Sequence, residues 1–342
     1  MKGPSVKLVL LFFSLCIFFL SCRKDPAISI VEEEIISIPV GFPSVDFPAD
    51  NGFTNERWIL GKQLFFDKQL SKNNTISCAS CHKQEFAFSD NVPLSKGDNN
   101  SVGTSNAPSL ANVAYHPYFT RAGGVPTLEM QILVPIQEHN EFNTNMLDVV
   151  EKLKQNSIYE SMAQLAYNRS LDAFVITRAL ATFERSLISG NSKFDDYYYN
   201  GNTSILNESE QRGFLLFTSN KTNCSECHSG FNFTNYAFEN NGLYINYADS
   251  GRMRLTQLPQ DRARFKVPSL RNIALTAPYM HDGSFYTIAA VIEHYNSGGQ
   301  NHVHKSNLIQ PLALTSQEKQ DLINFLNSLT DNEFAVNKKF KE

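Results

Sequence analysis

Two segments of the sequence place a histidine directly after two cysteines that are three positions apart. The segments are NTISCASCHKQEFAFSD (residues 74–90) and KTNCSECHSGFNFTN (residues 221–235). Two thiols at this spacing can bond to the vinyl groups of a haem, and the adjacent imidazole can reach its iron. The pattern therefore predicts two covalently bound haem c groups. The residues that would hold them are Cys78, Cys81 and His82 for the first haem, and Cys224, Cys227 and His228 for the second.

Other uses of these cysteines fit less well. A zinc site requires its two cysteine pairs about 15–20 residues apart, whereas Cys78 and Cys224 lie in different halves of the chain. A thioredoxin-like centre needs one such pair beside alternating strands and helices, and that alternation is not visible. Disulfides between the two units are compatible with an exported protein, but they would not require the histidines.

The N-terminus is typical of an exported lipoprotein. Lys2 and Lys7 precede the apolar run LVLLFFSLCIFFLSC, which ends at Cys22. This is the pattern of a signal peptide, and Ser21 before Cys22 resembles a bacterial lipobox. We expect a signal peptide at 1–22, a lipid on Cys22, a tether at 23–52 and a membrane-anchored protein in the periplasm. An uncleaved anchor or an ordinary signal peptide would also place the chain outside the cytoplasm, where bacterial haem attachment takes place.

The remainder of the chain is long enough for two domains. It belongs to a sequence of 342 residues with 42% hydrophobic residues, and the net charge of −4, without a run of Lys or Arg, predicts no nucleic-acid partner. Fragments recur in both halves: LGKQLFF (60–66) corresponds to RGFLLF (212–217), and APSLANVAY (107–115) to VPSLRNIAL (267–275). A tandem duplication of a cytochrome c-like domain explains both pairs.

Apolar residues at helical spacing predict an all-α fold of two tandem cytochrome c-like domains. Residues 171–189 are interpreted as an interdomain helix. Residues 315–331 open with a capping box of Thr315 and Glu318, and resemble the closing helix of a cytochrome c. The expected organisation is an N-terminal domain at 53–170, a helical linker at 171–205 and a C-terminal domain at 206–335.

The duplication allows the far sides of the two haems to be compared. The predicted helix at 287–299 offers His294 and Tyr295, whereas the corresponding positions in the first half are Val134 and Pro135. Neither Val nor Pro can bind iron, so the first haem is expected to keep an open position for chemistry and the second to be closed for electron transfer.

Polar residues near Pro135 are suited to proton transfer. Glu141 could take one proton from a peroxide and return it to the leaving oxygen, and Gln131 could orient the bound oxygen. From spacing alone, both could equally be solvated loop residues, which is our interpretation of Glu138.

The chain from about residue 53 to 331 resembles the bacterial di-haem cytochrome c peroxidases. It is most similar to the branch that contains the di-haem oxidase that matures methylamine dehydrogenase. Besides the two haem motifs, the resemblance rests on the segments NAPSLAN, LEMQILVPIQEHNEF, FERSLISGNSKFD, KVPSLRNIALTAPYMHDG and VIEHYNSGG.

This resemblance implies roles for particular residues. Gln131, Pro135 and Glu141 match the family's distal glutamine, proline and catalytic glutamate. Tyr295 matches the tyrosine that closes the second haem in the maturation-oxidase branch, and His294 remains the alternative ligand. The resemblance also implies a Ca²⁺ ion held by oxygen atoms, which suit a hard cation; the matching residues are Asn106, Thr276 and Pro278.

The sequence departs from the family in two places. The family motif FxWDG between the haems is replaced by YFTRAGG, with Thr120 in place of the tryptophan. The removable histidine ligand of the classical enzymes is also missing, because no His or Met occurs between Lys83 and Tyr115; His116 is the nearest and is interpreted as a packing residue. We therefore expect the first haem to be open without prior reduction.

The resemblance implies a peroxidase that reduces hydrogen peroxide to water at the first haem. Electrons would reach that haem through the second haem from a small redox protein such as a cytochrome c or a cupredoxin. Two alternatives remain open: an oxidase that acts on a specific protein partner, and an electron carrier without catalysis.

Overall fold

The computed structural model describes Met1 and residues 35–342, and residues 35–342 form one compact unit. The predicted signal peptide from residue 2 onwards, the predicted lipid attachment at Cys22 and the predicted tether as far as residue 34 lie outside the described residues. The described part is helical, with short 3₁₀ turns and one antiparallel pair of two-residue strands, β1 (Phe238–Glu239) and β2 (Phe265–Lys266). The α-helices are α1 (Asn55–Phe66), α2 (Cys78–Cys81), α3 (Leu128–Gln131), α4 (Leu133–Gln137), α5 (Met146–Lys154), α6 (Ser157–Tyr167), α7 (Ala173–Arg185), α8 (Lys193–Tyr198), α9 (Glu208–Phe217), α10 (Cys224–Cys227), α11 (Met253–Thr256), α12 (Ile288–Asn296), α13 (Ser316–Asn327) and α14 (Asn332–Val336).

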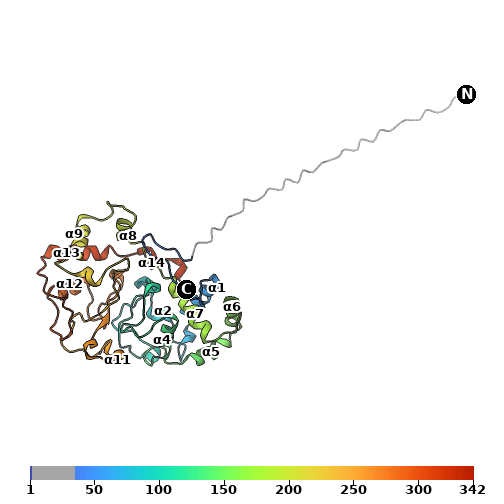
Figure 1. Cartoon of the computed structure of the whole chain (residues 1–342). Helices are drawn as coiled ribbons and strands as arrows, with labels where there is room; N and C mark the ends of the chain where they lie inside the picture. Colours follow the sequence, from blue (N-terminus) through green and yellow to red (C-terminus); the bar gives the residue numbers. More distant parts are fainter. Residues whose placement is uncertain (2–34) are drawn as a thin grey trace. The chain divides into compact units, whose positions relative to one another are not determined.

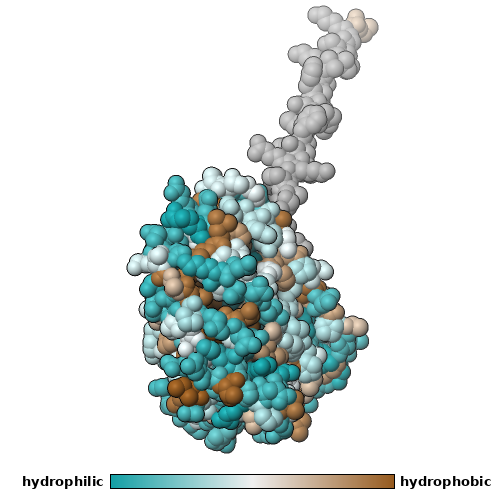
Figure 2. Space-filling view, turned by 60° about the vertical axis from the view of Figure 1, so that its left-hand side comes forward, coloured by the Kyte–Doolittle hydropathy of each residue, from teal (hydrophilic) through white to brown (hydrophobic). Residues whose placement is uncertain are grey.

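The predicted all-α fold of two cytochrome c-like halves is confirmed. Figure 1 shows α1, α5, α6 and α7 on one side of the unit and α9, α12 and α13 on the other. Each side has its own hydrophobic core. Hydrophilic side chains cover most of the face in Figure 2, and hydrophobic residues gather there in small groups. Within the described residues, no helix is long and apolar enough to span a membrane.

The same close helix crossing is built into both halves. In the first half α1 crosses α7, and a Cβ atom on Gly61 would lie 1.9 Å from the carbonyl oxygen of Ala179. In the second half α9 crosses α13, and a Cβ atom on Gly213 would lie 2.0 Å from the carbonyl oxygen of Asp321. Gly61 and Gly213 occupy the same place in the recurring fragments, so one packing solution is used twice.

We expect Gly61→Ala to destabilise the haem-loaded protein by about 1–3 kcal/mol, because the added methyl group must push α1 away from α7. Gly52→Ala is the matched control, since a Cβ atom there would have no neighbour within 4 Å. Denaturant unfolding followed by far-UV circular dichroism measures both variants. Equal midpoints for the two variants would contradict the close crossing.

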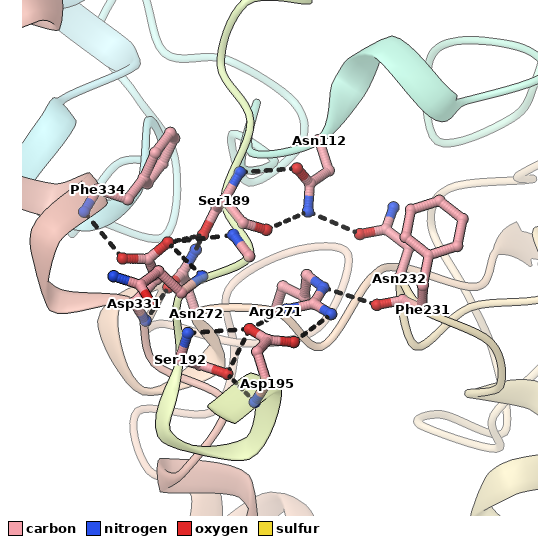
Figure 3. Close-up of polar contacts among 12 residues, drawn as sticks. Asn112, Ser189, Ser192, Asp195, Phe231, Asn232, Arg271, Asn272, Asp331 and Phe334 are labelled. Atoms are coloured by element: carbon pink, nitrogen blue, oxygen red, sulfur yellow. Dashed lines mark hydrogen bonds and ion pairs between the residues drawn. The ribbon is translucent and has the colours of Figure 1, made fainter. Parts of the chain in front are cut away.

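The asparagine of each recurring PSLxN fragment makes the same contacts. Asn112 accepts a hydrogen bond at Oδ1 from the backbone nitrogen of Ser189 at 2.8 Å, and Asn272 accepts one from that of Asp331 at 2.7 Å. Both asparagines have left-handed backbone conformations, with φ of 61° and 59°. Figure 3 shows the two asparagines on either side of Ser189. Each one therefore ties its fragment to the chain that follows α7 or α13.

Two sequence interpretations concern the long helices. The capping box of α13 is confirmed: Thr315 Oγ1 accepts from the nitrogen of Glu318 at 3.2 Å, and the Glu318 carboxylate accepts from the nitrogen of Thr315 at 2.8 Å. The helix expected between the domains is α7, and its apolar face lies in the core of the first half against α1. The linker at 171–205 stays a prediction.

The C-terminal segment returns to the first half, which the sequence did not indicate. Phe334 on α14 and Phe340 pack with Phe88, with ring centroids 5.6 and 6.1 Å from that of Phe88. The Gln84 side chain donates hydrogen bonds to the carbonyl oxygens of Phe334 and Asn337 at 3.0 and 2.8 Å. The chain end therefore supports the loop that follows the first CxxCH motif.

Candidate haem sites and distal pocket

Each CxxCH motif folds as one short helical turn that ends at its histidine. In the first, α2 ends at His82, whose Nδ1 donates a hydrogen bond to the carbonyl oxygen of Phe88 at 2.8 Å. In the second, α10 ends at His228, whose Nδ1 donates to the carbonyl oxygen of Phe233 at 3.1 Å. A carbonyl oxygen only accepts, so Nδ1 carries the proton in both rings. Nε2 is then the free lone pair, as an iron ligand requires.

The titration behaviour of these residues suits haem attachment rather than thiol redox chemistry. Burial lowers the pKa of His82 and of His228, which favours the neutral imidazole. Burial also raises the pKa of Cys81 and of Cys227 to about 11. Redox-active cysteines have lowered pKa values, so the shift is in the opposite direction. The cysteines in the described part of the chain form no disulfide.

One cavity extends from the second CxxCH site into the first half, and Cys78, Cys81 and His82 are not among the residues that line it. Its lining includes Gln131 and Glu184 from the first half, and Cys224, His228 and Tyr295 from the second. The Oε1 atom of Gln131 is buried in the protein without a hydrogen-bond partner among the described residues. A haem c would bond to the paired thiols, and its iron would bind the neutral imidazole. The unsatisfied Oε1 of Gln131 could accept a hydrogen bond from an oxygen ligand on the iron. The residues therefore fit the group.

The predicted distal residues lie in one segment of the chain, which runs through α3 and α4 and the loop that follows them. Gln131 ends α3, Pro135 lies in α4, and Glu141 follows in the next loop. The carbonyl of Pro135 accepts a hydrogen bond from the nitrogen of Phe142 at 3.1 Å, which folds the loop back towards α4. The loop conformation thus brings Glu141 back beside the proline.

A second loop holds the backbone of Glu141. The nitrogen of Asp98 donates to the carbonyl oxygen of Glu141 at 2.7 Å. Gly97 allows this approach, since a Cβ atom there would lie 2.1 Å from the carbonyl oxygen of Asn140. Much of the Glu141 surface is accessible, but the surrounding protein partly desolvates the carboxyl group. This desolvation and the nearby Glu138 carboxylate raise the pKa of Glu141 to about 7, near the optimum for a proton shuttle.

The structure separates the two candidate ligands of the second haem. Tyr295 lines the cavity that also contains His228 and Cys224, and burial raises its pKa to about 12. His294, the neighbouring residue on α12, donates a hydrogen bond from Nε2 to the carbonyl oxygen of Asn241 at 2.9 Å and does not line the cavity. The geometry therefore favours Tyr295 over His294.

The three residues predicted to bind calcium lie around the same cavity. Asn106, Thr276 and Pro278 all line the cavity. However, the Oδ1 atom of Asn106 accepts a hydrogen bond from Nη2 of Arg121 at 3.1 Å. A guanidinium group thus occupies the oxygen atom that a calcium ion would need, so the site does not fit the ion. Calcium binding by these three residues stays a prediction, and this contact argues against it.

Glu184 is a site residue that the sequence analysis missed. It lies on α7, is only 6% exposed and lines the cavity near Cys78. Its carboxyl group makes no hydrogen bond or ion pair within residues 35–342, and desolvation raises its pKa to about 8. The sequence did contain a signal for it: Glu184 lies next to Phe183 on a helix with a buried face, and a carboxyl group at such a position indicates a possible site residue.

His116 also lines the cavity, and its Nε2 atom is buried without a hydrogen-bond partner among the described residues, so its interpretation as a packing residue stays a prediction. Its Nδ1 atom lies 3.4 Å from the ammonium nitrogen of Lys266, and its ring contacts Tyr236 edge-on at 5.2 Å between centroids. Burial lowers the pKa of His116 to about 3. Thr120 lines the same cavity.

Comparisons with known proteins agree with this arrangement. Residues 55–204 match the family model described as di-haem cytochrome c peroxidase, and residues 211–330 match that of cytochrome c. The chain is 35% identical to the methylamine utilization protein MauG of Methylorubrum extorquens, over 86% of this chain and 83% of the relative. It is 30% identical to the cytochrome-c peroxidase IdrP1 of Pseudomonas sp. strain SCT, over 85% of each chain.

A solved structure extends the similarity to the fold. A MauG-like protein associated with microbial copper homeostasis superposes with a TM-score of 0.84 and 34% identity, over 89% of this chain and 97% of that one. Together with the duplicated CxxCH turns and the histidines held through Nδ1, these matches show that the chain is an oxidoreductase of the di-haem cytochrome c peroxidase family and carries two covalently bound haem c groups.

Proposed function

We propose that the protein reduces hydrogen peroxide to water at the N-terminal haem, with electrons delivered through the C-terminal haem. The observation that carries this proposal is the difference between the two distal sides. The first has Gln131 with an unsatisfied oxygen, Pro135 and Glu141 with a raised pKa, and the second has a phenol, Tyr295. On the first distal side, Glu141 can transfer protons, and Pro135 stands where the second side has a possible iron ligand.

The residues of the first pocket divide the work of peroxide cleavage. When bound, the haem supplies the redox chemistry that breaks the O–O bond, and the overall change consumes two electrons and two protons for each peroxide and yields two water molecules. The carboxylate of Glu141 takes a proton from one peroxide oxygen and returns it to the other, which leaves as water. Gln131 orients the peroxide by hydrogen bonding. Pro135 offers neither a ligand atom nor a backbone donor.

The second haem would serve electron entry, with His228 and Tyr295 as its ligands. The donor would be a small redox protein, either a cytochrome c or a cupredoxin. Peroxide reduction would take place in the periplasm, and the lipid on Cys22 would keep the enzyme at a membrane surface. Because the first distal side is open from the start, activity would not require prior reduction.

A second candidate function is the oxidation of a specific protein partner. It is favoured by the similarity to the methylamine utilization protein MauG and by Tyr295 at the second haem, since an anionic oxygen ligand stabilises oxidised iron. An electron carrier without catalysis is the third alternative, and it requires both irons to be closed by protein ligands.

Two measurements on the full haem-loaded protein separate these functions. Electron paramagnetic resonance of the fully oxidised protein should show one high-spin haem, and its absence together with no response to peroxide would exclude both enzymatic functions. A steady-state assay with peroxide and a reduced small cytochrome then tests the peroxidase. A spectral response to peroxide without turnover of the donor would favour the protein-oxidase function instead.

The choice of the second ligand can be tested directly. We expect Tyr295→Phe to change the absorption and resonance spectra of the second haem, because the phenyl ring offers no ligand atom. His294→Gln is the matched control on the same helix; it should leave these spectra unchanged, since the His294 imidazole is bonded to Asn241. The reverse pattern would assign the ligand to His294.

A further inference from the structure

Arg121 lies against Asn106, the residue predicted to begin a calcium site. Its Nε and Nη2 atoms donate hydrogen bonds to the backbone carbonyl oxygen of Asn106 at 3.0 and 2.6 Å, and Nη2 also reaches Oδ1 at 3.1 Å. The amide orientation is set from the other side, because Nδ2 of Asn106 donates to the carbonyl of Val92 at 3.1 Å. Asn106 is only 5% exposed. Its two oxygen atoms are therefore both engaged by one guanidinium group.

The surroundings of Arg121 are short of negative charge. Within residues 35–342 it forms no ion pair with a carboxylate at 4 Å or less, and Asp282 and Asp249 act on it only from a greater distance. The Asp282 carboxylate already accepts a hydrogen bond from the hydroxyl of Tyr244 at 2.6 Å. A divalent cation placed here would meet a fixed positive charge that no carboxylate contacts directly.

A second cation lines the same cavity. The backbone nitrogen of Lys266 donates to the carbonyl oxygen of Arg121 at 2.8 Å, and its ammonium group donates to the carbonyl oxygen of Tyr118 at 2.8 Å. Burial, and after it the charge of Arg121, lowers the pKa of Lys266 to about 8. Lys266 comes from β2 in the second half and Arg121 from the first. Together the two side chains carry the charge of one calcium ion across the boundary between the halves.

We propose that Arg121, with Lys266 beside it, takes the place of the calcium ion predicted between the two halves, so that this protein neither binds nor needs calcium there. The guanidinium group joins the loop of Asn106 to its surroundings by hydrogen bonds, as a metal would by coordination. A side chain cannot be removed by a chelator, so this junction would persist wherever free calcium is scarce.

The test uses the full haem-loaded protein and does not depend on peroxide turnover. Elemental analysis after gel filtration in calcium-free buffer should find far less than one calcium per chain. Adding EGTA or calcium chloride should leave both the Tm and the haem absorption spectrum unchanged, because a ligand that does not bind the folded state cannot shift its stability. One calcium per chain, with a fall in Tm on chelation, would overturn the proposal.

Two variants make the test specific to Arg121. Arg121→Gln removes the charge and releases the oxygens of Asn106, so its Tm should rise with added calcium. Arg121→Lys keeps the charge and should remain insensitive to calcium. A calcium-dependent Tm in the lysine variant, or none in a folded glutamine variant, would show that Arg121 does not stand in for the metal. If neither variant folds, the calcium content of the unaltered protein still decides.

Discussion

Glu141→Gln is expected to lower kcat/KM for hydrogen peroxide by at least ~10²-fold while both haems stay attached. The amide cannot take up a proton at neutral pH, so the shuttle between the two peroxide oxygens is lost. The backbone of residue 141 is held by Asp98 through a 2.7 Å hydrogen bond that does not involve the side chain, so the loop should keep its conformation. A steady-state peroxide assay at a fixed haem content measures the effect.

The pH profile provides a second readout of the same residue. The carboxylate is the proton acceptor, and the pKa of Glu141 is raised to about 7. The rate should therefore rise as the pH increases through about 7 and level off above it, and Glu141→Gln should remove this rise. Glu138→Gln is the matched control: it removes a charge that raises the pKa of Glu141, so the midpoint should move to lower pH with the plateau retained. Near-normal turnover by Glu141→Gln would remove Glu141 from the mechanism.

The second large effect concerns stability. Asp195→Ala is expected to cost about 3–5 kcal/mol of unfolding free energy, because it leaves the Arg271 guanidinium buried without its counter-charge. The two side chains form a paired contact, Nη1 to Oδ2 and Nη2 to Oδ1, both at 2.8 Å, and their side chains are only 4% and 1% exposed. Figure 3 shows this pair below Ser189, where the chain passes from the first half to the second.

An exposed ion pair provides the control. Glu293 accepts from Lys319 at 2.8 Å, but its side chain is 58% exposed, and solvent screens such pairs. Glu293→Ala should therefore change the stability little. Denaturant unfolding of both variants, with haem retained, makes the comparison. Equal stabilities would mean that the buried pair contributes no more than a surface contact.

Much of the chemistry could be predicted from the sequence because it depends on local spacing. A CxxCH motif confines its two thiols and its imidazole to a single turn, so the haem attachment residues required no knowledge of the fold. The duplication could be predicted for the same reason, because Gly61 and Asn112 recur as Gly213 and Asn272 in short matching fragments. Each pair makes the same contact in both halves.

The remaining features depend on contacts between residues far apart in the chain, which spacing does not encode. His294 and Tyr295 are neighbours in sequence, and only the packing of α12 turns one towards Asn241 and the other into the cavity. In the sequence Glu184 is one of several polar residues of α7, and only the structure shows that it lines the cavity. The contact of Arg121 with Asn106 within the first half, and the return of Phe340 from the chain end to the first core, likewise exist only in the folded chain. Residue types and short spacings determined which cofactors the protein holds, and tertiary packing decided which side chains face them.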